Sequence, residues 1–270
     1  MIEFLQLDFM RLALAGCLLL SVTLGYFGVH VIQRRIVFVD LALAQISTMG
    51  IALAFLLETD PILLSILFTL VGAALLSVRT RNVRVPQEAI MGIVYAVASA
   101  VSILLISKTP HGEADILKIF FGDVLGVTSG QLLAVAAVFG AVLLLHALFR
   151  RSFRLVSFEP ERAASEGISL RLWDFLFYVS IGIVIAVAIR IGGVLLVFSY
   201  LVIPAVAAFF LVSGVGAAFA TAQVVGAAAS VLGLYASFRF DLPTGTTVVA
   251  TLGTLLVAAG GAAWARRRFD

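Results

Sequence analysis

The chain has 270 residues, of which 62% are hydrophobic and only 12% are charged, and its formal net charge is +3. This composition, with a mean hydropathy of +1.17, excludes the soluble globular class and predicts a membrane protein. Its apolar runs show no strand-like alternation, and lipid offers no water to backbone groups, so the runs should be helices. The basic excess indicates charge held on the cytoplasmic side of a membrane and not binding to nucleic acid. The single cysteine, Cys17, excludes a disulfide framework and a thiolate metal cluster.

The apolar runs predict an all-α, polytopic transmembrane helix bundle. In chain order the runs are Leu12–Val29, Leu41–Leu57, Pro61–Val78, Ala89–Ile106, Leu132–Phe149, Phe175–Ile189, Val194–Val212, Ala217–Ala236 and Thr246–Ala263. The first run is expected to be a retained span, because Arg34 and Arg35 follow it and no basic segment precedes it. Only Gly192 and Gly193 separate the sixth run from the seventh, so these two can form a re-entrant pair, and eight spans remain an alternative to nine. Pro204 should kink or unwind the seventh run.

The basic residues predict an orientation with the N-terminus outside and the C-terminus inside a bacterial plasma membrane. In that orientation, the cytoplasmic loops hold most of the 18 Lys and Arg residues, namely Arg34, Arg35, Arg79, Arg81, Arg84, Arg150, Arg151, Arg154, Arg162, Arg171, Arg266, Arg267 and Arg268. No internal repeat or low-complexity linker suggests a second domain. Residues 1–270 are therefore expected to form a single transmembrane domain.

The cytoplasmic loop at residues 150–171 is not a simple connector. It contains the charged stretch FEPERAASEG, which lies between runs of nearly pure hydrocarbon. Its alanines and glutamates favour a short helix, and Gly167 offers a stop. A short charged helix on one face of a membrane protein is typical of a docking element for a soluble partner.

The external loop at residues 107–129 is also unusual. It contains a predicted half-helix, Ile116–Leu125, that is too short to span, and an H-x-E-x-D pattern formed by His111, Glu113 and Asp115. Imidazole and carboxylate groups are ligand types that zinc and manganese accept, and Gly112 would permit the turn that brings them together. The alternative is a solvated loop without bound metal.

Polar groups are few inside the spans, and the second run holds the most informative ones. Asp40 comes just before this run, and Gln45 follows five residues later. At about 100° per residue, the two side chains lie about 140° apart around a straight helix, so they are not a natural bidentate pair. One interpretation is an N-cap aspartate with an interhelical glutamine hydrogen bond. The other is a pair that lines a transport pathway, duplicated if the protein is a two-fold dimer.

Enzyme motifs are absent from the sequence. There is no G-x-x-x-x-G-K-[ST], and neither of the two lysines, Lys108 and Lys118, follows a glycine. We therefore expect no catalytic residues, no cofactor bound by this chain and no ATP site of the P-loop type. A self-contained secondary transporter would require broken helices with charges near the midplane, and the charge-poor spans argue against it.

Several segments resemble the permease subunits of the ABC-3 family, which are membrane components of bacterial zinc, manganese and iron ABC importers. The resemblance covers most of the chain in order, through the segments Val39–Phe55, Glu88–Ser99, Ile116–Leu132, Glu161–Leu176 and Gly192–Leu211. It implies a type II ABC importer-like permease for a divalent metal, the transported substrate. It further implies a homodimer that docks two ATP-hydrolysing subunits and receives metal from an external binding protein.

The resemblance also implies roles for individual residues. Glu161, Arg162, Ala163 and Gly167 would belong to the coupling helix that sits in the ATPase subunit. The second helix of the family carries a metal-contacting aspartate and histidine. Aligned on Gly50, the histidine position holds Gln45 here, and Asp40 is displaced by one residue from the aspartate position. Three alternatives follow: Asp40 acts alone, the His111 cluster substitutes, or the protein transports a metal complex or another small solute.

Overall fold

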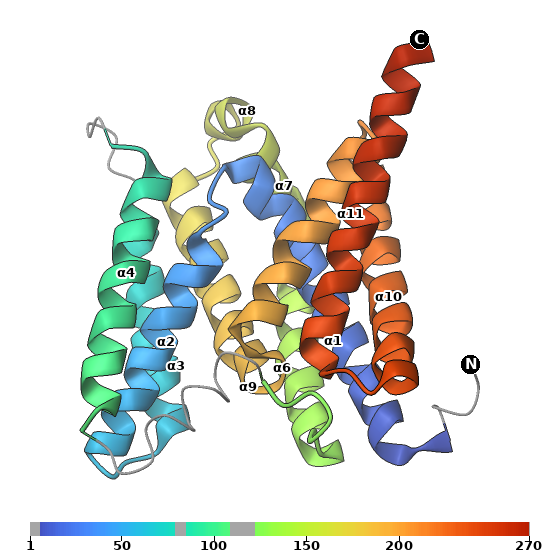
Figure 1. The fold of residues 1–270 in the computed structure, drawn as a ribbon. Coiled ribbons are helices and arrows are strands. Elements are labelled where there is room, and N and C mark those ends of the chain that lie inside the picture. The colour runs from blue at the N-terminus through green and yellow to red at the C-terminus, as the bar shows by residue number, and fades with distance from the viewer. Residues whose placement is uncertain (1–5, 79–84, 109–121, 270) are drawn as a thin grey trace. The chain divides into compact units, whose positions relative to one another are not determined.

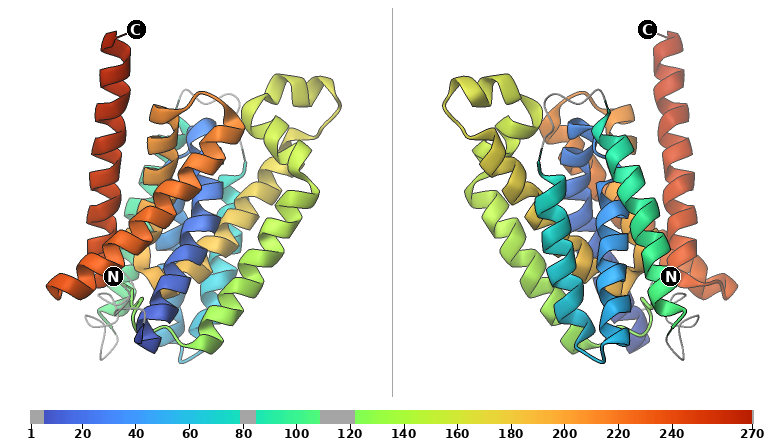
Figure 2. Two further views of the ribbon diagram at one scale, coloured as in Figure 1. Left: turned by 90° about the vertical axis from the view of Figure 1, so that its right-hand side faces the viewer. Right: turned by 90° about the vertical axis from the view of Figure 1, so that its left-hand side faces the viewer.

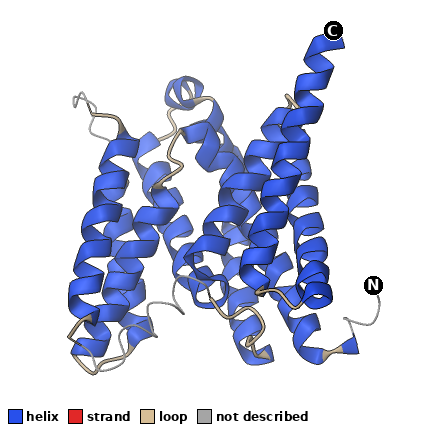
Figure 3. Cartoon of the chain, in the orientation of Figure 1, coloured by secondary structure: helices blue, strands red, loops and turns tan. Residues whose placement is uncertain are grey.

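The computed structural model describes residues 6–78, 85–108 and 122–269, and within these ranges the regular structure is helical, without strands (Figure 3). Figure 1 labels the helices along the chain. They are α1 (Asp8–Arg34), α2 (Val39–Leu56), α3 (Pro61–Leu76), α4 (Gln87–Ile106), α6 (Ser129–Leu148), α7 (Arg150–Phe158), α8 (Pro160–Ser165), α9 (Leu170–Leu211), α10 (Val215–Phe240) and α11 (Thr244–Phe269).

Each predicted apolar run falls on a helix, which confirms the all-α class. Seven of the described helices are long and apolar enough to cross a membrane, and α3 is a shorter apolar helix. The 42-residue α9 contains two of the predicted runs, and Gly193 interrupts it with φ 69° and ψ 167°. A break is therefore present where Gly192 and Gly193 predicted one, because this dihedral pair suits glycine alone. Eight or nine spans, and the orientation of the chain, stay predictions.

The chain forms two compact units, each assembled from segments that are far apart in sequence. Described residues within Met1–Ile32, Phe120–Phe139 and Arg190–Asp270 make the first unit. The second unit consists of described residues within Gln33–Ile119 and Gly140–Ile189.

In the first unit, small residues allow α1 to approach its neighbours closely. A Cβ added at Gly28 would lie 1.8 Å from the carbonyl oxygen of Leu201 on α9. One added at Gly226 on α10 would lie 2.1 Å from the Oγ of Ser21. Helices in lipid associate mainly by van der Waals packing, so these contacts hold α1 against α9 and α10. By contrast, a Cβ at Gly261 on α11 would meet nothing within 4 Å, so that glycine is not required for packing.

The loop that follows the undescribed residues 109–121 also belongs to the first unit. Most of the predicted half-helix Ile116–Leu125 lies outside the described residues. Its last four residues, Gly122–Leu125, are non-helical, and Gly122 has φ 67°. The backbone turns here because it rests on the break in α9. The amide of Asp123 donates to the carbonyl oxygen of Ile191 at 3.1 Å, and a Cβ at Gly122 would lie 2.3 Å from the carbonyl carbon of Gly192.

In the second unit, α2 packs against α3 and α4, and the three helices lie side by side in Figures 1 and 2. Gly50 on α2 permits this approach, because an added Cβ would lie 2.6 Å from the carbonyl oxygen of Leu64. The short helices α7 and α8 form a compact pair at the end of this unit where α2 and α4 begin (Figure 1).

Candidate functional site

Asp40 lies in the first turn of α2 and is completely buried. It is not the N-cap, because Phe38 occupies that position without a side-chain hydrogen bond. Neither carboxylate oxygen of Asp40 has a hydrogen-bond partner among the described residues. Buried carboxylates in proteins are normally paired, hydrogen-bonded or bound to a cation, so Asp40 is a candidate ligand for a positively charged species.

Gln45 lies on the next turn and is also buried, at 1% exposure. Its amide nitrogen has no hydrogen-bond partner in the described part of the chain, so the predicted interhelical bond from this group is not formed. The nearby hydroxyls are satisfied within the packing. Ser47 shares a 2.7 Å hydrogen bond with Ser65 on α3, and Thr48 donates to the carbonyl oxygen of Ala44 at 3.0 Å. Asp40 and Gln45 are therefore the polar side chains of α2 that remain available to a ligand.

The donors on α2 do not complete a metal site by themselves. No group of three or more His, Cys, Asp or Glu side chains comes together in the residues that the structure describes. The second candidate cluster, His111, Glu113 and Asp115, lies outside the described residues. A metal held at Asp40 would need further oxygen ligands, such as water or groups from a second copy of the chain.

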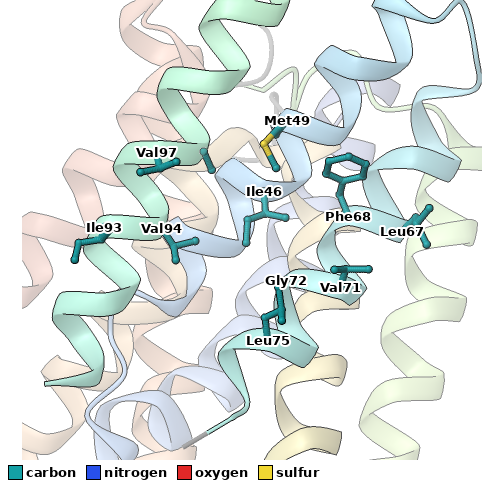
Figure 4. A pocket seen from close by; sticks show the side chains of 11 residues that line it. Ile46, Met49, Leu67, Phe68, Val71, Gly72, Leu75, Ile93, Val94 and Val97 are labelled. Carbon is teal, nitrogen blue, oxygen red and sulfur yellow. The ribbon is translucent and has the colours of Figure 1, made fainter. Parts of the chain in front are cut away.

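Another part of α2 lines a pocket of about 560 Å³ between α2, α3 and α4 (Figure 4). Ile46 and Met49 contribute from α2, with hydrocarbon side chains from the other two helices such as Phe68 and Val97. A cavity lined in this way offers no ligand to a cation. This pocket is therefore not a metal site, and hydrocarbon fits it.

The short helix predicted in this loop is present as α8, and it ends where Gly167 predicted a stop. Gly167 has φ 76°, its amide donates to the carbonyl oxygen of Ala164 at 3.1 Å, and the amide of Ile168 donates to that of Ala163 at 2.9 Å. These two bonds form a Schellman motif, which satisfies the last carbonyl groups of the helix. Ala163 is completely buried and packs with Leu155 and Val156 of α7, so α8 is fixed on α7 by one apolar face.

The opposite face of α8 is exposed and charged. Arg162 contacts Glu159 at 2.9 Å and Glu166 at 3.0 Å, and Arg151 of α7 contacts Glu166 at 2.8 Å. The hydrogen bond that Arg162 donates to Glu159, followed by the one it donates to Glu166, raises the pKa of Arg162 above its ordinary value, so the guanidinium stays charged at any physiological pH. Glu161 has an exposed side chain. This face presents both signs of charge to a partner.

Sequence reasoning did not single out the buried ion pair of Arg34 and Asp174. The Nη1 of Arg34, the last residue of α1, lies 2.7 Å from Oδ1 of Asp174 in α9, and both side chains are at most 3% exposed. The Nε of Arg34 donates to Oγ of Ser157 in α7 at 2.8 Å, and its guanidinium lies 3.9 Å from the centroid of Phe177. The charge pattern places Arg34 only among the basic residues of the predicted cytoplasmic loops. The available signal was a carboxylate, Asp174, directly before a long apolar run.

Pro204 lies inside α9, and the helix continues through it. The non-helical residue inside α9 is Gly193 instead. A kink at Pro204 stays a prediction.

Comparison with known proteins gives consistent matches along the chain. The model of the ABC 3 transport family matches residues 6–261. The chain is 24% identical over 257 residues to the manganese transport system membrane protein MntC of Halalkalibacterium halodurans, with 95% of this chain and 88% of that protein covered. It is 26% identical over 246 residues to the manganese import system permease protein ScaB of Streptococcus parasanguinis, with coverages of 91% and 88%.

The fold is also similar to that of a solved structure, described as PsaBC from Streptococcus pneumoniae in complex with Fab. The TM-score is 0.83 at 25% identity, and the match covers 96% of this chain and 95% of that one. The predicted helical membrane fold is confirmed by this likeness.

Proposed function

The chain belongs to the ABC 3 transport family, and on this premise we propose that it is the permease subunit of an ATP-driven importer for manganese. The protein is a multi-pass protein of the bacterial plasma membrane. The observation that carries the metal assignment is the buried carboxylate of Asp40, which has no hydrogen-bond partner in the described residues. A divalent cation in transit would supply the positively charged partner that this carboxylate lacks.

The choice of manganese over zinc rests on the donors of α2. Zinc sites in proteins are built from histidine, cysteine and carboxylate ligands, whereas manganese accepts sites made of oxygen alone. Asp40 and Gln45 offer a carboxylate and an amide oxygen, and no imidazole is present on α2. The two relatives above are named as manganese systems, which supports the same choice.

Metal selectivity can be tested by uptake in cells that lack their own manganese and zinc importers and express this permease with its cognate partner subunits. Accumulated metal would be measured by mass spectrometry. We expect manganese to accumulate in preference to zinc, and the substitution Gln45→His to shift the ratio toward zinc by about tenfold. Met49→Leu, on the pocket side of the same helix, is the matched control and should leave the ratio unchanged. Equal uptake of the two metals by the unaltered protein would contradict the assignment.

ATP hydrolysis is assigned to two separate subunits that dock on α8, one on each copy of a homodimeric permease. The support is a short helix with its apolar face on α7 and a charged face exposed, in a chain without a P-loop. Metal would arrive from an external metal-binding protein. The residues of this segment then have two roles. Ala163 and Gly167 set the position and the end of the helix, while Glu161 and Arg162 contact the ATPase subunit.

Docking can be tested by co-purification of the ATPase subunit from membranes. Glu161→Arg reverses an exposed charge that makes no ion pair in the described structure, so it should lower recovery of the ATPase at least tenfold without unfolding the permease. Glu58→Arg makes the same reversal in the exposed connection between α2 and α3 and is the control. Equal recovery with both variants would place the ATPase contact elsewhere.

A further inference from the structure

The guanidinium of Arg34 joins the segments that precede and follow the short helix α8. On one side it binds Ser157, in the last turn of α7, and on the other it binds Asp174, near the start of α9. The hydroxyl of Ser157 in turn donates to the carbonyl oxygen of Phe153 at 2.8 Å. Phe177 covers the guanidinium. The buried guanidinium of Arg34 therefore binds both the end of α7 and the start of α9, the two helices that flank α8.

The same arginine is linked by a short stretch of chain to the candidate metal site. Arg34 ends α1, Arg35 takes φ 56°, and α2 begins at Val39, directly before Asp40. Ile36 in this connection is 3% exposed, and the amide of Val39 donates to its carbonyl oxygen at 3.0 Å. Only residues 35–38 separate Arg34 from α2, so a displacement of Arg34 reaches Asp40 through a short connection in which Ile36 is buried.

Thermodynamic stability alone does not explain a buried ion pair at this position. Desolvation of the two charges offsets most of their attraction, and apolar replacements of similar size are often as stable or more stable. What such a pair supplies is a directional link, because a planar guanidinium with fixed donors accepts few arrangements of its partners. The planar fork of Arg34 fixes α7 and α9 relative to the end of α1.

We propose that the Arg34–Asp174 pair, with Ser157, is the link that transmits movement of the α7–α8 segment to the start of α2, where Asp40 lies. The proposal rests on the proposed function, in that α8 receives the ATPase subunit. Arg34 and Asp174 are positioning residues and do not touch the metal. When the partner closes on ATP, displacement of α8 shifts Ser157 and Asp174 together, and the guanidinium carries the shift into residues 35–40.

The first test measures this transmission without transport. Hydrogen exchange would be followed in residues 39–46 and in residues 150–168, with and without a non-hydrolysable ATP analogue bound to the docked ATPase. In the unaltered complex we expect exchange to change in both segments. In Asp174→Asn, and in the double variant Arg34→Met with Asp174→Leu, the change should persist at 150–168 and fall at least fivefold at 39–46. The double variant contains no uncompensated buried charge, so it should fold even if the single variant does not.

The second test compares metal uptake with ATP hydrolysis in proteoliposomes. Loss of the link should lower metal transported per ATP at least tenfold while ATPase activity stays within about twofold, whereas a purely structural defect would lower both together. Wild-type exchange changes or transport ratios in the double variant would overturn the link while leaving the proposed function intact. Failure of the unaltered permease to bind an ATPase subunit would instead overturn the proposed function, and the link with it.

Discussion

Replacing Asp40 by asparagine tests the reasoning on the candidate site most directly. The substitution preserves the size of the side chain and removes its charge at a position with no solvent exposure. Neither carboxylate oxygen has a hydrogen-bond partner in the described residues, so the substitution breaks no hydrogen bond of the charged group. Desolvation of a buried ion is worth several kcal/mol, and a buried neutral amide without partners still costs about 1–3 kcal/mol.

The buried carboxylate therefore costs more to desolvate than the buried amide that would replace it. From this difference in desolvation cost we expect Asp40→Asn to stabilise the metal-free protein by about 2 kcal/mol, which corresponds to a rise in Tm of about 4–8 °C. Manganese uptake should fall by about tenfold or more, because the amide cannot neutralise a divalent cation. Stability and transport should therefore move in opposite directions, as is common at functional sites.

The assay combines thermal unfolding of the purified permease in detergent, with and without manganese, with uptake in the importer-deficient cells. Manganese should raise the Tm of the unaltered protein and leave that of Asp40→Asn unchanged. Asp60→Asn is the matched control, since Asp60 is the exposed N-cap of α3 and asparagine caps about as well as aspartate. A lower Tm together with full manganese uptake in Asp40→Asn would refute the reasoning.

Further variants test the packing of each unit. Gly28→Ala should destabilise the protein by about 3 kcal/mol or more, because the added methyl group would lie 1.8 Å from the carbonyl oxygen of Leu201. Neither group can rotate away, since the methyl group is fixed to one backbone and the oxygen belongs to the other. Gly253→Ala, where an added Cβ meets nothing within 4 Å, should instead stabilise α11 by about 0.5–1 kcal/mol; equal effects in thermal unfolding would contradict the packing argument. Asp60→Ala removes the acceptor that binds the amide of Ile62 at 2.8 Å and should cost about 1 kcal/mol, and an unchanged Tm would show that this cap is not formed in the membrane.

The sequence predicted those features that depend on neighbouring residues. The apolar runs located the helices to within a few residues, since one span is decided by the hydropathy of about 20 consecutive side chains. The charged stretch before Gly167 predicted both α8 and its end, because helix preference and a left-handed glycine are local properties. The end of the predicted half-helix was wrong at Gly122–Leu125, where contact with Gly192 sets the backbone.

The environment of the polar side chains, by contrast, was decided only by the tertiary structure. The sequence placed Asp40 at the start of a span and left open whether it capped the helix; burial without a partner distinguishes it from the exposed cap Asp60. Arg34 and Asp174 are 140 residues apart, and neither hydropathy nor charge pattern selects such a pair. Sequence alone thus predicted which segments form long apolar helices, because transfer free energy adds up residue by residue. Which charges meet inside the protein depends on packing between distant segments. Only this packing brought Arg34 and Asp174 together, at the place where we infer that ATP-driven movement is passed on toward Asp40.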